Sequence, residues 1–531
     1  MPRTGYMDFC RVEQQKPGHH EHIHETGRAD TSELRQGELR LHHLHVRPDL
    51  PDQRMCLRLR SAVIHQGRGG PVPPLSADLR GKPPQQKSTM KTESKTIAYD
   101  LQASSFNWEI APGKAIQAWG FNEQLPGPVL RANAGDTLVV RLTNNLSEAT
   151  TIHWHGICLP AAMDGTDATQ RPIEPGEVFE YRFVVPDAGT FWYHAHQNET
   201  VQMERGMYGA LIVDGDTDPV VDGEQLFMID DMKLDANNEF TEPAWFLPRM
   251  IERHDGRQGD TLLLNGKEDL VINAHAGQTE RWRFINSSSA RYFRLYLGGK
   301  EFKIIASDGG LLEHPMAVTE VLITPGERVD IAVGPFAEGE TFAMESLAYD
   351  RTTFLKAKRE TFASVKVGAA RPSVAHIPDR LRTIEPLTDQ GAVTTRRVTL
   401  SVVPLLRDQK DIRVNNTVHG NDKPVMVGEL QVWEVANASL MDHPFHLHGF
   451  FFQMIEEDGK APAFRAWKDT YNVKPKSTIR IAWMPDNRPG TWMYHCHIIE
   501  HHAAGMMAHF DVVDGSKPYG RPAPAHKHHH H

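Results

Sequence analysis

The chain has 531 residues with a formal net charge of −10, and 40% of its residues are hydrophobic. This length is too great for a single hydrophobic core, so several domains are expected. The negative net charge argues against a nucleic-acid-binding protein, which presents a basic surface. No apolar run reaches the length of a membrane span. We therefore expect a globular protein whose partners are small molecules. The sequence leaves its oligomeric state open.

Residues 1–95 differ in composition from the rest of the chain. They are rich in Arg, His, Gln and Pro, and they have neither strand alternation nor a helical stripe. They also lack the apolar core of an export signal. We expect a disordered leader from upstream or vector sequence, with Met90 as the natural start, and the alternative is a tail that collects metal. Residues 517–531 form a tail whose final run, His528–His531, resembles a purification tag.

A threefold internal repeat organises the chain between these ends. Residues 134–144, 276–286 and 427–437 each run from a turn glycine through an alternating strand to an asparagine at the same offset. Repeats at this domain-sized interval indicate duplicated domains. Short alternating strands separated by Gly, Pro, Asn and Asp turns favour an antiparallel sandwich or barrel in each repeat.

Histidine pairs mark the first repeat. His153 and His155 lie in Ile-His-Trp-His-Gly, and His194 and His196 lie in Trp-Tyr-His-Ala-His. Because side chains alternate along a strand, both histidines of a pair face the same side. A single pair of this kind is more often an ordinary surface or core feature than a metal site. The third repeat makes that interpretation weak.

The third repeat adds two further clusters. Its histidines, thiol and thioether are His443, His446, His448, His495, Cys496, His497, His501 and Met506. Alternation sends His495 and His497 to one face of a strand and Cys496 to the other. Cysteine with imidazole and a weak axial methionine is the ligand set of a blue-copper site. The sequence therefore predicts an electron relay between two metal sites, in which the first and third repeats must touch.

These four motifs, in this order, resemble those of multicopper oxidases of the three-domain, laccase-like bacterial type, over roughly residues 96–516. The resemblance implies an all-β fold of three consecutive cupredoxin-like Greek-key sandwich or barrel domains. We expect them at residues 96–217, 218–385 and 386–516, with the type 1 copper in the third. It also implies four copper ions, one of type 1, one of type 2 and two of type 3. The second repeat, which has no His-x-His pair, is interpreted as a spacer that shapes the substrate pocket.

The resemblance also assigns each ligand to one of the copper ions, which the spacing of the residues alone cannot do. The type 1 copper would take His443, Cys496 and His501, with Met506 as weak axial ligand. The type 2 copper would take His153 and His446. One type 3 copper would take His155, His194 and His495, and the other His196, His448 and His497. Electrons would be taken up at Cys496 and His501 and would reach dioxygen through His495 and His497.

Reduction of dioxygen to water consumes protons, and one carboxylate is a candidate to supply them. Asp164, eleven residues after His153, matches the acidic position near the type 2 copper in relatives. It would act as a general acid, and the alternative is an ordinary turn aspartate. His502 departs from the family, in which a carboxylate commonly follows the type 1 histidine. This puts the second half of the proton route in doubt. Asp469 is interpreted as structural.

Three functions compete. The first is a laccase that oxidises phenols and aromatic amines, and the second is a cuprous-ion oxidase of copper tolerance. The 19 methionines are dispersed, and the segment from Arg351 to Leu430 holds only Met426, which favours the laccase because thioethers bind Cu(I). The third is a non-catalytic cupredoxin-fold scaffold, which would have lost ligands that this chain retains. Relatives are mostly periplasmic or secreted, but no export signal is visible, so localisation stays open.

Overall fold

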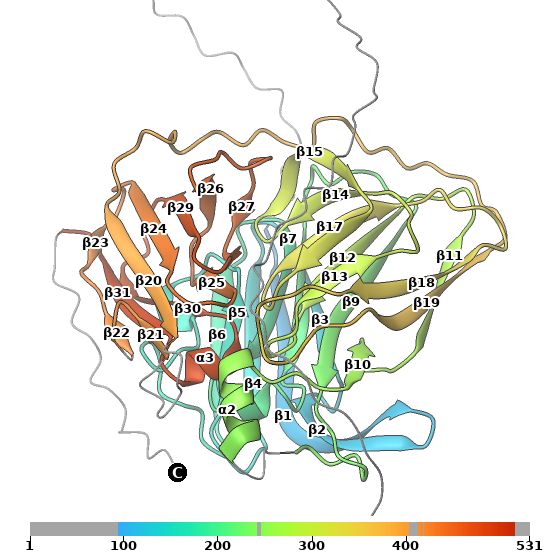
Figure 1. The fold of residues 1–531 in the computed structure, drawn as a ribbon, viewed down its shortest axis with the longest axis horizontal. Helices are drawn as coiled ribbons and strands as arrows, with labels where there is room; N and C mark the ends of the chain where they lie inside the picture. The colour runs from blue at the N-terminus through green and yellow to red at the C-terminus, as the bar shows by residue number, and fades with distance from the viewer. Residues whose placement is uncertain (1–93, 242–245, 403–411, 418, 516–531) are drawn as a thin grey trace, which may run out of the picture. The chain divides into compact units, whose positions relative to one another are not determined.

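The computed structural model describes residues 94–515, apart from 242–245, 403–411 and 418. Nearly all of the expected leader and tail, including the tag, therefore lies outside the described residues. The described chain is built mostly of β-strands, with a few short helices (Figure 1). None of these helices is long and apolar enough to cross a membrane.

Residues 96–214 form two four-stranded sheets, with the strand orders β2-β1-β4-β6 and β3-β8-β7-β5. β6 alternates exposed and buried side chains, as expected of a strand with one face on a core, whereas β7 is buried along its whole length. The strands are β1 (Thr96–Ala111), β2 (Lys114–Phe121), β3 (Gly127–Asn133), β4 (Thr137–Asn144), β5 (Ile152–His155), β6 (Val178–Val184), β7 (Gly189–Ala195) and β8 (Tyr208–Asp214).

Residues 223–368 form a second pair of sheets, with the orders β10-β9-β12-β17-β14-β15 and β11-β19-β18-β13-β16. Their buried side chains make a separate core around Trp282 and Phe284. The strands are β9 (Gly223–Met232), β10 (Thr261–Leu264), β11 (Leu270–His275), β12 (Glu280–Asn286), β13 (Phe293–Tyr296), β14 (Phe302–Ser307), β15 (Gly310–Val318), β16 (Glu320–Ile323), β17 (Arg328–Val333), β18 (Thr341–Leu347) and β19 (Glu360–Gly368).

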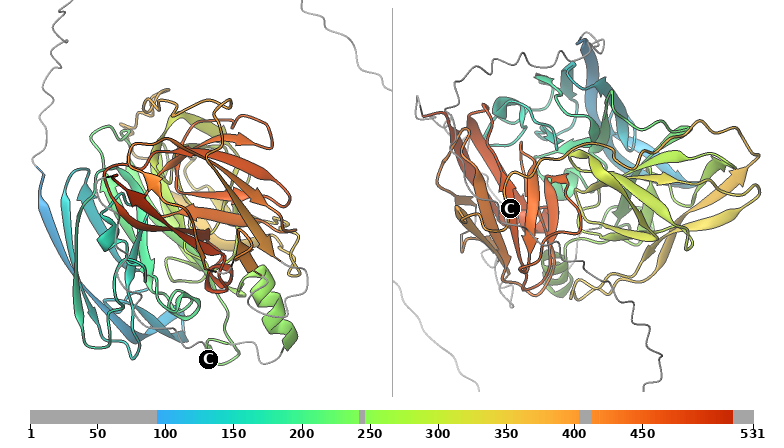
Figure 2. Two further views of the ribbon diagram at one scale, coloured as in Figure 1. Left: turned by 90° about the vertical axis from the view of Figure 1, so that its left-hand side faces the viewer. Right: turned by 90° about the horizontal axis from the view of Figure 1, so that it is seen from above.

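Residues 396–513 form the third pair, with the orders β21-β20-β24-β29-β26-β27 and β22-β31-β30-β25-β28, and β23 also pairs with β31. The strands are β20 (Arg396–Val402), β21 (Ile412–Val414), β22 (Gly420–Asn421), β23 (Val425–Met426), β24 (Gln431–Asn437), β25 (His443–Leu447), β26 (Phe452–Glu457), β27 (Trp467–Lys468), β28 (Thr470–Val473), β29 (Thr478–Trp483), β30 (Gly490–Cys496) and β31 (Met507–Val513). In Figure 2 the strands that belong to one pair of sheets have similar colours and lie together.

The repeated asparagine has the same task in each sheet pair. The side-chain amides of Asn144, Asn286 and Asn437 each donate to two backbone carbonyls at a strand end, and each Oδ1 accepts from the backbone N–H two residues later. A buried turn must satisfy these backbone groups. The threefold repeat predicted from the sequence is thus a repeated hydrogen-bonding unit.

The fold is all-β with cupredoxin-like domains, as expected. Each of the expected segments 96–217, 218–385 and 386–516 contains both sheets of one pair. We propose these limits as the domain boundaries, and we call the segments the first, second and third domains.

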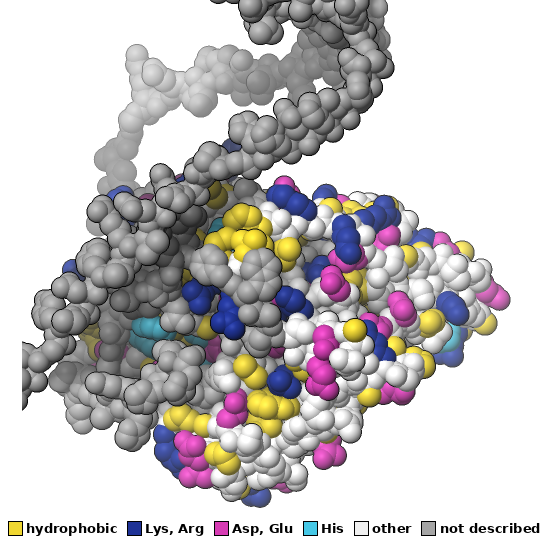
Figure 3. Space-filling view, turned by 60° about the horizontal axis from the view of Figure 1, so that its bottom comes forward, with side chains coloured by type: hydrophobic (Ala, Val, Ile, Leu, Met, Phe, Trp, Pro, Cys, Tyr) yellow, Lys and Arg dark blue, Asp and Glu magenta, His cyan; other side chains and the backbone are white. Residues whose placement is uncertain are grey.

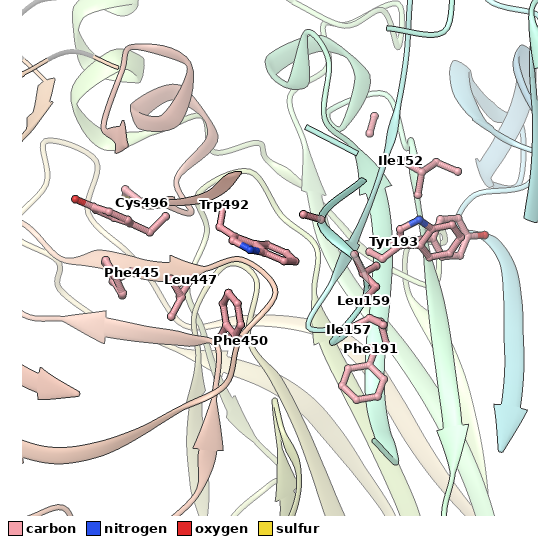
Figure 4. Close-up of a cluster of buried hydrophobic side chains, with 14 of the residues drawn as sticks. Ile152, Ile157, Leu159, Phe191, Tyr193, Phe445, Leu447, Phe450, Trp492 and Cys496 are labelled. Atoms are coloured by element: carbon pink, nitrogen blue, oxygen red, sulfur yellow. The ribbon is translucent and has the colours of Figure 1, made fainter. Parts of the chain in front are cut away.

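The first and third domains share one hydrophobic core. A single cluster of buried side chains includes Ile152 and Tyr193 from the first domain and Phe445, Leu447 and Trp492 from the third. Figure 4 shows these two groups of side chains facing one another. The contact between the two domains that the metal motifs require is therefore present.

Short helices cluster beside this shared core. They are the 3₁₀ helix η1 (Ala161–Met163), α1 (Glu199–Gln202), α2 (Phe246–Asp255) and α3 (Ile499–Ala503). α3 contacts both α1 and α2, so one helix from each domain meets at this junction. Figure 1 shows α2 and α3 next to each other. Where the described side chains are visible in Figure 3, acidic and basic side chains both occur across the surface.

Candidate metal centres

Cys496, at the end of β30, lies beside two histidines. Its Sγ lies 3.5 Å from Nδ1 of His443 and 3.6 Å from Nδ1 of His501, and these two nitrogens lie 3.2 Å apart. The centre of a triangle of this size lies about 2 Å from each corner, close to the length of a metal–imidazole bond. All three residues are buried. The triangle can therefore hold one metal ion.

The far edges of the two rings are fixed by hydrogen bonds. Nε2 of His443 lies 2.8 Å from the Ser439 hydroxyl, and Nε2–H of His501 donates to the backbone carbonyl of His254 at 2.9 Å. Such outer contacts orient a ligand and select its tautomer. Met506 is buried nearby, and its backbone carbonyl accepts from the Cys496 N–H at 3.1 Å. His501 in α3 and Met506, just before β31, thus both lie back against the cysteine.

The eight remaining histidines gather between the first and third domains. They are His153, His155, His194, His196, His446, His448, His495 and His497, and all are buried. Rings from the two domains are in direct contact. His155 stacks on His446 with ring centroids 3.8 Å apart, and His153 lies 4.0 Å from His448. β5 and β7 face β25 and β30 across this cluster.

One nitrogen of most of these rings points into the cluster unpaired. Within residues 94–515 as described, no hydrogen-bond partner is found for Nε2 of His153, His194, His196 and His446, for Nδ1 of His155, or for either nitrogen of His497. Leaving a buried polar atom unpaired is costly. Nε2 of His448 and Nε2 of His495 face each other at 3.0 Å. Converging unpaired imidazole nitrogens fit bound metal ions.

The opposite nitrogens are held from behind. Backbone carbonyls lie beside Nδ1 of His153, His194, His446 and His495, while the carboxylates of Asp164, Asp469 and Glu199 hold His448, His155 and His196. This second layer leaves the unpaired nitrogens free to bind metal.

The division of the histidines expected from the family resemblance differs at one point from the proximity of their ligand atoms. The ligand atoms group His155 and His194 with His497, and His196 and His448 with His495. The reason is strand register, because β25 and β30 pair His446 with His495. His495 therefore lies beside the end of β25, next to His448, whereas His497 lies beyond the strand end.

Burial also sets the charge of the ligands. It holds the pKa of His155, His194, His448, His495 and His497 well below the ordinary value, so these imidazoles are neutral and can bind metal. Burial likewise lowers the pKa of His501 to about 3 and raises the pKa of the Cys496 thiol to about 12. A thiolate at Cys496 therefore requires a bound cation.

The second domain also reaches the histidine cluster, which the sequence analysis missed. Arg328, at the start of β17, is fully buried and donates to both oxygens of Asp469 at 2.8 and 2.5 Å. Asp469 in turn lies 3.1 Å from Nε2 of His155. At Gly326, where φ is +85°, an added Cβ would lie 2.8 Å from the His497 ring. The second domain is thus a wall of the site as well as a spacer.

Asp164 lies directly against the cluster. It follows η1, and Gly165 after it has a φ of +83°, with no room for a Cβ against the Ile152 carbonyl. The Asp164 backbone carbonyl accepts from Nδ1 of His153 at 2.9 Å, and its Oδ2 accepts from Nδ1 of His448 at 3.0 Å. Its Oδ1 is buried and lies 3.3 Å from Nδ1 of His153, but it makes no hydrogen bond within the described residues.

Comparisons with known proteins agree with this geometry. Three family models, each described as multicopper oxidase, match residues 102–218, 236–362 and 394–516. Multicopper oxidase MmcO of Mycobacterium tuberculosis is 32% identical over 446 residues, covering 76% of this chain and 84% of that protein. A multicopper oxidase from Campylobacter jejuni, described as a metallo-oxidase, has a TM-score of 0.71 and 29% identity, covering 80% of this chain and 93% of that one. A laccase from Pediococcus acidilactici has a TM-score of 0.70 and 28% identity, covering 80% and 92%.

The family matches and the site geometry coincide. The matches at residues 102–218 and 394–516 contain every histidine of the two clusters, Cys496 and Met506. The donor set of one triangle with sulfur and one group of imidazoles suits copper. The chain belongs to the multicopper oxidase family and is a copper-dependent oxidoreductase with dioxygen as its acceptor.

Proposed function

We propose that this enzyme is laccase-like and couples one-electron oxidation of phenols or aromatic amines to the four-electron reduction of dioxygen to water. The observation that carries this proposal is the direct covalent link between two metal centres. Cys496 belongs to the triangle with His443 and His501, and its chain neighbours His495 and His497 belong to the histidine cluster. One strand end thus joins electron uptake to dioxygen reduction.

We propose four copper ions per chain. The grouping of the ligand atoms supports the type 1 and type 3 ligands, and it also places His155 near His153 and His446. His443, Cys496 and His501 would hold the type 1 ion, with Met506 as weak axial ligand. His153 and His446 would hold the type 2 ion, and the type 3 pair would be held by His155, His194 and His497 and by His196, His448 and His495. Bound there, copper supplies the ability to accept electrons singly and to deliver them to dioxygen.

The chain's own groups orient the ligands and handle protons. Asp164 holds His153 and His448 from behind, through its carbonyl and through Oδ2. We propose that its Oδ1, which makes no hydrogen bond within the described residues, carries a proton toward the histidine cluster as dioxygen is reduced. Burial of the cluster excludes bulk water, so protons must arrive through such fixed groups.

The first prediction tests this role. Replacing Asp164 with Asn should preserve the blue colour and the rate at which a donor reduces the type 1 copper, because the amide oxygen can still accept from His448. It should slow reoxidation by dioxygen by about 100-fold or more, since positioned proton transfer contributes at least that much. Stopped-flow absorbance separates the two half-reactions. Unchanged reoxidation would reduce Asp164 to an orienting turn residue.

The second prediction concerns the donor. Both classes have relatives, because one similar structure is described as a metallo-oxidase and another as a laccase. The dispersed methionines favour organic donors over Cu(I). On copper-loaded enzyme, a phenol and an aromatic diamine should each give a higher kcat/KM than Cu(I) in parallel oxygen-uptake assays. Faster turnover of Cu(I) would assign the enzyme to copper tolerance instead.

A non-catalytic scaffold is the third alternative. The closely packed, neutral imidazoles argue against it, because a scaffold has no need of unpaired nitrogens in a buried core. The same assays decide this as well. A scaffold would take up no oxygen with any of the three donors.

A further inference from the structure

Glu199 is a buried carboxylate that neither the motifs nor the proposed ligand set includes. β7 ends at Ala195, His196 follows, and Asn198 turns the chain with a φ of 42° into α1, which begins at Glu199. Glu199 is 8% exposed. A carboxylate this deeply buried requires partners for both oxygens. The turn at Asn198 brings the Glu199 side chain back toward His196, which precedes the helix.

The two oxygens of Glu199 contact two different histidines. Oε1 lies 2.9 Å from Nδ1 of His196, and Oε2 accepts from Nδ1 of His502 in the third domain. His502 is itself packed against the cluster, because its ring stacks on that of His495 with centroids 4.2 Å apart and an angle of 21°. Glu199 therefore ties the back of one type 3 ligand to a residue from the opposite domain.

This contact sets which nitrogen of His196 faces the cluster. Nδ1 is directed at Glu199, so Nε2 is the nitrogen available to a metal ion, and it has no hydrogen-bond partner within the described residues. Nε2 groups with nitrogens of His448 and His495. Outer carboxylates of this kind orient a ligating imidazole and raise its basicity.

Glu199 and His502 also bear on the carboxylate that the family resemblance leads one to expect at position 502. Position 502 has no carboxylate, yet a carboxylate does lie against the cluster beside it. It comes from α1 of the first domain and contacts His502 itself. In its contact with a ligand, Glu199 matches Asp164 and Asp469, which hold His448 and His155.

We propose that Glu199 is a positioning residue for copper binding at His196, and that His502 holds Glu199 in place. This rests on the proposed function only in that it assumes copper at the histidine cluster. It adds a residue pair to the outer shell of the type 3 site. It is independent of which donor the enzyme oxidises.

Copper retention tests the proposal without recourse to activity. Each protein is loaded with copper and titrated with a chelator, while total copper, blue absorbance and paramagnetic copper are measured. Glu199→Ala should release one ion at about 10–100-fold lower chelator concentration than wild type, as expected for loss of an outer-shell partner. The blue absorbance should persist. The ratio of paramagnetic copper to total copper should rise, because the type 3 ion that stays behind loses the neighbouring ion to which its unpaired electron was coupled.

Two further variants separate hydrogen bonding from packing. Glu199→Gln keeps the size and one acceptor, so its copper retention should lie between wild type and Glu199→Ala. His502→Phe keeps a ring that can stack on His495 but removes the donor to Glu199, so it should shift retention in the same direction. Retention equal to wild type in Glu199→Ala and His502→Phe would overturn the proposal.

Glu204 provides a matched control. It is also a buried carboxylate near α1, but its oxygens contact Lys233 N–H and Ser289 rather than a ligand. Burial raises its pKa to about 8, so Glu204→Gln is a close mimic of its protonated form. This variant should retain copper like wild type. An equal loss in Glu204→Gln would mean that any buried carboxylate here acts through general stability, which would also overturn the proposal. If wild type itself held no copper beyond the blue ion, the proposed function would fail instead.

Discussion

Replacing Cys496 with Ser is expected to abolish the blue colour and to reduce turnover by more than about 100-fold. Loss of even an outer-shell partner costs about 10–100-fold in activity or metal affinity, and here a ligand that joins the two centres is lost. The serine hydroxyl is not a thiolate, so the sulfur–copper bond that gives the colour cannot form. Absorbance in the visible range, copper per chain and oxygen uptake measure the outcome.

Cys158→Ser provides the control for this experiment. Cys158 is the other free cysteine in the described part of the chain, and burial raises the pKa of its thiol far above the ordinary value. It belongs to none of the ligand groups, so Cys158→Ser should stay blue and active. Cys496→Ser should still retain the copper of the histidine cluster. A blue Cys496→Ser protein would refute the assignment of the type 1 site.

The second large effect is expected at Arg328. Replacement with Met leaves Asp469 buried without its bidentate partner. It also removes a positive charge that lies 3.5 Å from the carboxylate of Asp308. Breaking a buried ion pair on one side costs about 3–5 kcal/mol. Copper retention should also fall, because Asp469 orients His155. Urea unfolding of the copper-free protein, followed by tryptophan fluorescence, measures the loss of stability.

An exposed arginine provides the comparison for Arg328. Arg397 pairs with Glu434 at 3.2 Å, but its side chain is 78% exposed. Pairs of this kind contribute little. Arg397→Met should therefore leave the urea midpoint unchanged. Equal midpoints for the two variants would mean that Arg328 is not the anchor of Asp469.

The convergence of the histidines and Cys496 was predictable because its signal is local. Alternation along a strand puts His153 with His155 and His495 with His497, and it turns Cys496 away, whatever the surrounding fold. The repeated asparagines likewise marked equivalent turns in all three domains. These features depend on residues only a few positions apart.

Apart from Asp164, the carboxylates behind the histidines were not predictable, because their contacts join distant segments. Arg328 and Asp469 are 141 residues apart, and Glu199 and His502 are 303 apart. No spacing in the sequence signals such pairs. The grouping of His497 with His155 and of His495 with His448 has the same origin, since it follows from the pairing of β25 with β30.

The central claim is that this chain reduces dioxygen completely to water with electrons taken singly. The most direct test is the stoichiometry of a single preparation of copper-loaded enzyme turning over a phenol, with oxygen uptake, oxidised donor and hydrogen peroxide measured together. Because O₂ takes up four electrons and four protons to give two waters, the account predicts four donor molecules oxidised by one electron for each O₂, and no peroxide. Two donor molecules per O₂, with peroxide accumulating in equal amount to the oxygen consumed, would contradict it.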